Sequence, residues 1–103
     1  MSRFSLEREG AKVKVTLGAE LTVSFVPELR ELLCAIQDDG VRDLVLDFSK
    51  TTFLDTAGLS LLLAARNGFS QEGRTIKLTR VQPSVFSLLE ALCLDKQLNA
   101  EMG

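Results

Sequence analysis

Residues 43–63 constrain the fold of this chain more than any other segment. Positions 44–48 (LVLDF) are apolar almost throughout and do not alternate, which is typical of a central strand covered on both faces. A polar connection at 49–52 and an apolar plug at 53–54 come next. Apolar residues at helical spacing then predict a helix over about 55–72, so a buried strand leads directly into a helix start.

The segments on either side predict further strands and helices. Alternation over 4–8 and 12–17, on both sides of a Glu9-Gly10 turn, predicts a β-hairpin with one buried face. Helical spacing then predicts an amphipathic helix that begins at Ser24 as N-cap and ends at Gly40.

The last third of the chain repeats this pattern once more. Residues 75–81 alternate as a fourth strand, and Pro83 and Ser84 open a third helix. The resulting order ββαβαβα predicts an α/β fold, a mixed four-stranded sheet with helices packed on it. Short connections between strands and helices imply right-handed crossovers and a mostly parallel centre. With 103 residues we expect a single domain over 1–103.

Residue types argue against an enzyme. The chain has no histidine, so a Cys/His catalytic pair and a histidine-containing metal site are excluded. Phosphate-binding, dinucleotide-binding and serine-nucleophile motifs are also missing from the sequence. Cys34 and Cys93 lie among apolar residues and are expected to be buried free thiols. We therefore expect no catalytic residue, no metal and no cofactor.

Charge and hydropathy limit the partners. The formal net charge is −2, and Lys and Arg are spread along the chain, so no basic face for nucleic acid is predicted. No apolar run is long enough to cross a membrane, and the first residues lack the apolar segment of a signal peptide. We expect a cytoplasmic protein that does not insert into membranes, and its oligomeric state stays open.

The start of the second helix, Asp55-Thr56-Ala57-Gly58, is the candidate functional centre. Asp55 is a good N-cap, and its charge suits the positive end of the helix dipole. Gly58 allows close approach of a neighbouring backbone, and the Thr56 hydroxyl is expected to point to solvent. On the residues alone, capping explains this motif better than regulation does.

The strand–turn–helix segment resembles the STAS domain, the family of bacterial anti-sigma factor antagonists. The resemblance covers nearly the whole chain, and the Asp-Thr-Ala-Gly-Leu element at 55–59 is its most specific part. It implies that Thr56 is the phosphorylation site. An unphosphorylated antagonist binds an anti-sigma factor serine/threonine kinase and frees the sigma factor, and a phosphatase reverses the modification.

The same resemblance implies a docking surface around the helix start. Its expected residues lie in the first turn of that helix and in the loop before the first helix: Asp55, Thr56, Ala57, Gly58, Leu59, Leu21, Thr22 and Ser24. Asp47 and Phe53 are expected to support this surface structurally.

Two features leave the partner open. Many antagonists have serine at the acceptor position and a second hydroxyl residue after it, whereas this chain has Thr56 followed by Ala57. The motif and the leucine run after it also resemble the small STAS subunit of the bacterial lipid-asymmetry ABC transporter. In that subunit the domain binds an ATPase constitutively. A STAS domain of a chemotaxis-linked signalling assembly is a third possibility.

Overall fold

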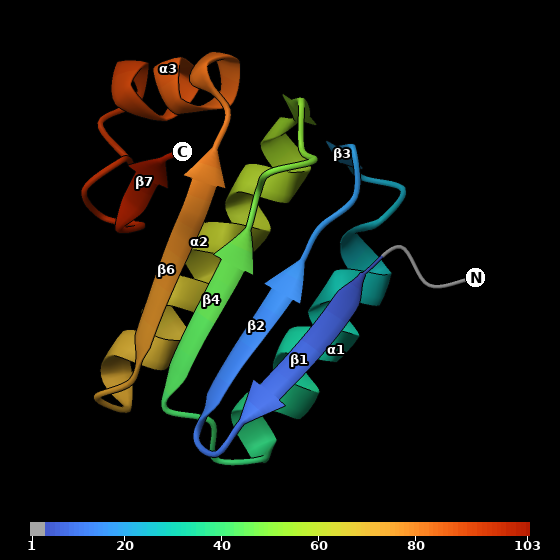
Figure 1. The fold of residues 1–103 in the computed structure, drawn as a ribbon, viewed down its shortest axis with the longest axis vertical. Helices are drawn as coiled ribbons and strands as arrows, with labels where there is room; N and C mark the ends of the chain where they lie inside the picture. Colours follow the sequence, from blue (N-terminus) through green and yellow to red (C-terminus); the bar gives the residue numbers. More distant parts are fainter. Residues whose placement is uncertain (1–3) are drawn as a thin grey trace.

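A computed structural model describes residues 4–103 of the chain. Strands and helices alternate through most of the sequence, as Figure 1 shows. In chain order the elements are β1 (Ser5–Glu9), β2 (Lys12–Thr16), β3 (Glu20–Leu21), α1 (Val26–Asp38), β4 (Asp43–Asp47), β5 (Phe53–Leu54), α2 (Thr56–Gln71), β6 (Thr75–Val81), α3 (Pro83–Ala91) and β7 (Ala100–Met102).

The main sheet has five strands in the order β1-β2-β4-β6-β7. β1 pairs antiparallel with β2, and the pairs β2–β4, β4–β6 and β6–β7 are parallel. The predicted mixed sheet with a parallel centre is thus confirmed. The predicted count of four strands is wrong by one, because β7 was expected to be an irregular tail. A separate two-stranded sheet joins β3 to β5 in parallel.

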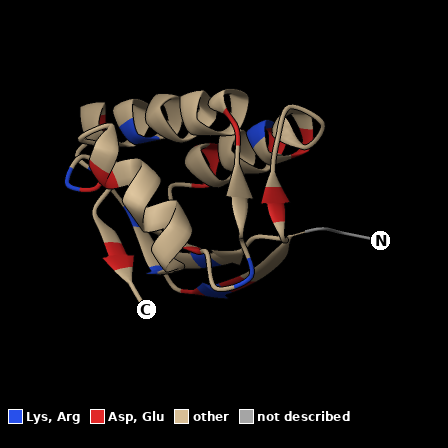
Figure 2. Ribbon diagram, turned by 90° about the horizontal axis from the view of Figure 1, so that it is seen from above, with Lys and Arg blue, Asp and Glu red and all other residues tan. Residues whose placement is uncertain are grey.

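The helices α1 and α2 lie side by side on one face of the sheet (Figures 1 and 2). The core forms between this helical layer and the inward side chains of the strands, such as Val15, Leu46 and Leu78, which are fully buried. Val45 faces the other way and is only half-buried, in register with Lys14 and Lys77. The expectation of a central strand covered on both faces is therefore wrong.

The hairpin forms over the predicted residues, but its first strand is not buried. Every residue of β1 is exposed, and Leu6 retains 46% of its accessible surface. β1 is one of the two edge strands of the sheet, so it has a neighbouring strand on one side only. The buried face that the alternation predicted is confirmed in β2, where Val13 and Val15 are buried.

Two local predictions about side chains are also wrong. The N-cap of α1 is Phe25, without a side-chain capping hydrogen bond, so Ser24 lies just outside the helix. Both free cysteines are exposed. Cys34 lines a groove between α1 and α2, and Cys93 lies in the turn after α3 with a φ of 58°. Apolar neighbours in the sequence do not ensure that a cysteine is buried, because burial depends on the direction in which the side chain points in the folded protein.

Within residues 4–103, the helices are all too short or too polar to span a bilayer.

Candidate functional site

The candidate site lies where α2 begins, beyond the carboxyl end of β4 (Figure 1). Hydrogen bonds join the connection between β4 and α2 to the segment before β3. The buried Thr51 donates its hydroxyl to the carbonyl of Gly18 at 2.8 Å, and the Thr52 N–H donates to the carbonyl of Ala19 at 2.8 Å. Pairing of β3 with β5 continues these contacts to Leu54, and the Asp55 N–H donates to the Leu21 carbonyl at 3.2 Å. The helix start is thereby fixed against the loop that leads into α1.

Asp55 is the N-cap of α2, as predicted. One carboxylate oxygen, Oδ1, accepts from the N–H of Gly58 at 2.9 Å, and Oδ2 accepts from the N–H of Val23 at 2.9 Å. The hydrogen bond from Gly58 is the main reason that the pKa of Asp55 is lowered, and the bond from Val23 acts in the same direction. A single carboxylate thus joins the first turn of α2 to the loop before α1.

Gly58 is needed because the two segments approach so closely. A Cβ atom at this position would lie 2.5 Å from the carbonyl oxygen of Leu21 and 2.8 Å from the Leu21 Cγ. Leu21 and Gly58 are both buried. Both residues therefore lie beneath the predicted docking surface and support it. The expectation that Leu21 and Gly58 are themselves part of the exposed surface is wrong.

Thr56 is the first residue of α2 and is exposed, as the sequence predicted. Within residues 4–103 its hydroxyl has no hydrogen-bond partner. Ala57 and Leu59 beside it are half-buried, and Leu59 packs against the core. The carboxylate of Asp55 already occupies the Gly58 N–H that an anion at the helix start would otherwise use. A phosphate on Thr56 would add negative charge beside a carboxylate that stays ionised.

The loop and strand around Thr56 display two large exposed apolar side chains: Val23, which the sequence did not single out, and Phe53, which it predicted as a structural support. Val23 is 66% exposed and Phe53 is 53% exposed. Phe53 was expected to be part of a buried plug, but only Leu54 of that pair is buried. Alternation in the two-residue strand β5 explains the difference, since neighbouring side chains point to opposite sides. Thr22 is half-buried and Ser24 is exposed in the same loop.

Asp47, the second predicted support, lies at the end of β4 and is fully buried. Its carboxylate pairs with Arg80 and, at 3.5 Å, with Lys14, and it accepts from the Ser49 N–H at 2.8 Å. Burial would raise the pKa of Asp47, but the hydrogen bonds from Arg80 and Ser49 outweigh it and lower the pKa to about 2. Asp47 therefore joins Ser49, at the beginning of the connection that leads to Thr56, to Arg80 of β6.

Asp47 and Asp55 have separate partners at the two ends of this connection and do not form a shared carboxylate pair. Among the described residues, no group of three or more Cys, Asp or Glu side chains could hold a metal ion. What the arrangement offers is an exposed hydroxyl on Thr56, with the exposed apolar side chains of Val23 and Phe53 in the neighbouring segments.

Comparison with known proteins assigns the chain to one family. Residues 4–100 match the family model described as "Mlab, STAS domain". The anti-sigma-B factor antagonist of Staphylococcus aureus is 28% identical over 90 residues, which are 87% of this chain and 83% of that protein. The corresponding protein of Staphylococcus epidermidis is 24% identical over 90 residues, with the same coverage of both chains.

Solved structures have the same fold. An anti-sigma factor antagonist from Mycobacterium paratuberculosis superposes with a TM-score of 0.82 at 23% identity, covering 94% of this chain and 82% of that one. The Bacillus cell fate determinant SpoIIAA in its phosphorylated form gives a TM-score of 0.76 at 21% identity, with 96% and 91% covered. With the family model matching almost its full length, the chain belongs to the STAS domain family.

Proposed function

We propose that this STAS domain is an anti-sigma factor antagonist, a protein-binding regulator without catalytic activity, and that phosphorylation of Thr56 switches its binding. In the unphosphorylated state it binds an anti-sigma factor serine/threonine kinase in the cytoplasm and keeps that kinase from its sigma factor. Phosphorylation by the kinase ends the interaction, and a phosphatase restores it. The docking surface comprises Asp55, Thr56, Ala57 and the exposed part of the loop before α1.

The observation that carries this proposal is the exposed hydroxyl of Thr56, which has no hydrogen-bond partner within residues 4–103 and lies directly beside the capping carboxylate of Asp55. A phosphate there brings about −1.5 to −2 charges at neutral pH. Because Asp55 is already bound to the Gly58 and Val23 N–H groups, the added charge meets a second anion. Bringing two neighbouring anions into a partner's interface costs desolvation and repulsion, which opposes docking. The name shared by the staphylococcal relatives supports the same function.

Phosphorylation of Thr56 is tested with the purified protein, the anti-sigma factor kinase of the same organism and ATP. Mass spectrometry should find one phosphate, located on Thr56, and a Thr56→Ser variant should still accept it. The variant Ser70→Ala removes an exposed hydroxyl near the end of α2, outside the groove between α1 and α2, and should not change the result. Thr56→Ala should accept no phosphate, yet lose less than about 1 kcal/mol of stability, because Asp55 provides the cap. A phosphate elsewhere, or none, contradicts the proposal.

A second function is favoured by the description of the matching family model, "Mlab, STAS domain". In this alternative the chain is a constitutive STAS subunit of a lipid-asymmetry ABC transporter and binds the ATPase subunit through the same surface. The alanine after Thr56 agrees with a site that is used for docking alone. The two functions differ in their partner. Affinity purification that recovers an ABC-type ATPase, with Thr56 unmodified, supports the alternative, and recovery of a serine/threonine kinase supports the antagonist.

A further inference from the structure

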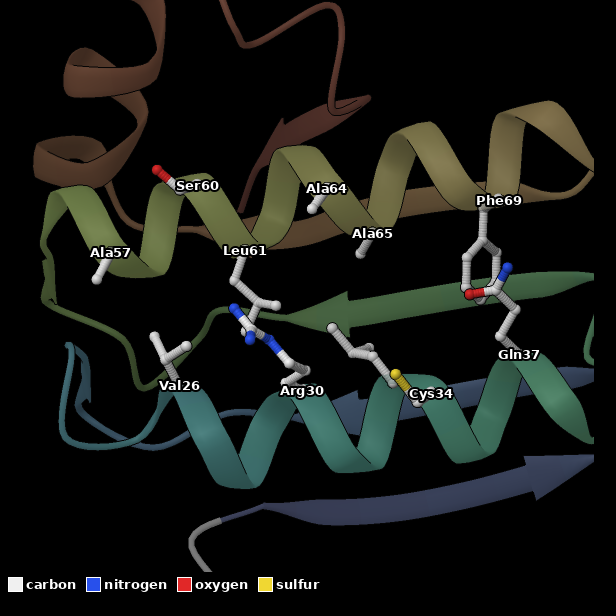
Figure 3. A pocket seen from close by; sticks show the side chains of 11 residues that line it. Val26, Arg30, Cys34, Gln37, Ala57, Ser60, Leu61, Ala64, Ala65 and Phe69 are labelled. Atoms are coloured by element: carbon white, nitrogen blue, oxygen red, sulfur yellow. The ribbon is translucent and has the colours of Figure 1, made fainter.

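An open groove runs between α1 and α2, along the face of the helical layer that points away from the sheet (Figure 3). Its volume is about 570 Å³. The lining from α2 includes Ala57, Leu61 and Ala65, which point towards α1 in Figure 3, and the lining from α1 includes Val26 and Cys34. The groove is mainly apolar, as binding grooves for amphipathic segments are.

Both ends of the groove are fixed by polar contacts between the two helical segments. At one end Asp55 binds the Val23 N–H just before α1. At the other end the side chain of Gln37 donates to Glu72, while Arg74 pairs with Glu72 at 2.9 Å and donates to the Gln37 carbonyl. The helices are thus held together at their ends with the space between them open. A preformed groove of this kind saves a partner the cost of ordering it.

Arg30 supplies the one charged side chain of the lining. Its guanidinium reaches across from α1 towards Leu61 in Figure 3, and within residues 4–103 it has no ion-pair partner. An unpaired cation at the wall of an apolar groove is complementary to a partner carboxylate. The occupant expected from the lining is therefore apolar over most of its contact face and acidic at one position.

The dimensions match a short helix. The α1 lining extends from Val26 to Gln37, which spans about 17 Å at about 1.5 Å per residue. Small side chains at Ala57, Ala64 and Ala65 leave room for another helix to approach the α2 backbone. The groove also begins at Ala57, next to Thr56, so it continues the docking surface of the proposed function.

We propose that the groove between α1 and α2 receives an amphipathic helix, about three turns long, of the kinase that docks at Thr56, and that a carboxylate on this helix pairs with Arg30. This inference rests on the proposed function. It adds the groove between α1 and α2 to the docking surface around Thr56 as a further part of the interface with the kinase. Thr56 then lies at one end of the contact, where it controls binding, and the groove supplies most of the apolar area.

The test measures binding of the anti-sigma factor kinase to variants of the unphosphorylated protein. Ala64→Arg places a large cation in the groove at an exposed position, and Ala35→Arg makes the same change at an exposed position of α1 outside the lining. Ala64→Arg should weaken binding at least about tenfold, and Ala35→Arg should not. Arg30→Glu should weaken binding as well, whereas Arg42→Glu, the same change at an exposed arginine outside the lining, should not.

Cys34 gives a second readout that needs no groove mutation. In a Cys93→Ser background it is the single thiol, and it is exposed in the groove. Kinase at ten times its Kd should slow alkylation of Cys34 about tenfold, because only the unbound fraction reacts.

The outcomes separate the two proposals. Thr56→Glu measured in parallel reports on the switch alone. If it abolishes binding while Ala64→Arg binds normally and Cys34 stays reactive, the groove inference is overturned and the antagonist function stands. If the wild-type protein does not bind the kinase at all, both are overturned.

Discussion

At the scale of single residues, two carboxylates position the site from opposite ends of one connection. Asp55 joins α2 to the loop before α1, and Asp47 joins the end of β4 to Arg80 and to the Ser49 N–H. Both have a lowered pKa because hydrogen bonds favour their charged forms. The surface around Thr56 is therefore held by groups that stay ionised at neutral pH.

Asp47 makes stability depend on pH in acid. Its pKa falls from the usual 3.8 to about 2 on folding, so the folded state binds fewer protons than the unfolded state between these values. The contribution is complete above pH 3.8 and is lost as pH falls through 2. It amounts to about 2 kcal/mol, since one pKa unit corresponds to about 1.4 kcal/mol.

Urea unfolding at pH 6 and at about pH 2.5 measures this contribution. Wild type should lose more stability over this interval than Asp47→Asn, whose buried group does not titrate. Equal losses in the two proteins would show that Asp47 is not the group responsible.

At the scale of elements, the decisive contact is between β3 and the first turn of α2. Gly58 lets the helix lie directly against the Leu21 carbonyl, and Asp55 fixes the segment that follows Leu21. The loop before α1, the helix start and the groove between α1 and α2 are therefore joined to one another by direct contacts. Any change that separates β3 from α2 should disturb all three.

The matched variants Gly58→Ala and Gly68→Ala test this contact. Both glycines lie within α2, but an added Cβ at Gly58 meets a backbone oxygen at 2.5 Å, whereas at Gly68 its nearest neighbour is the Gln37 side chain at 3.5 Å. Gly58→Ala should destabilise the protein by about 1–3 kcal/mol through overpacking. Gly68→Ala should stabilise it by up to about 1 kcal/mol through helix propensity. Thermal unfolding of the two variants measures the difference, and a neutral Gly58→Ala would contradict the close contact.

The elements were largely predictable from sequence because their patterns are local. The cap at Asp55, the helix that follows it and the strand at 75–81 were all identified from spacing and capping alone. The strands β3, β5 and β7 were missed because two or three residues are too few for a periodicity, and their pairing depends on partners distant in sequence. The exposure of Cys34 and Phe53 was missed for a related reason. Both depend on which side of a packed layer the side chain faces.

At the scale of the whole molecule, a sheet covered on one side by two parallel helices leaves distinct surfaces. The open face of the sheet carries Lys14 and Lys77, and Figure 2 shows Lys and Arg interspersed with Asp and Glu over the described elements. The helical side carries the apolar groove and, at its end, Thr56. We infer that one modification at this end controls an interface that extends along the helices. The proposed control needs no rearrangement of the fold, because a phosphate on Thr56 would change the charge at the edge of the proposed interface.

The affinity of the anti-sigma factor kinase for the two forms of the protein tests this account most directly. Calorimetric titration with the unphosphorylated protein and with protein phosphorylated on Thr56 gives both values of Kd under the same conditions. We predict that the phosphate weakens binding at least about tenfold, within the usual range of coupling between a modification and a binding site. Equal affinities for the two forms would contradict a switch at Thr56.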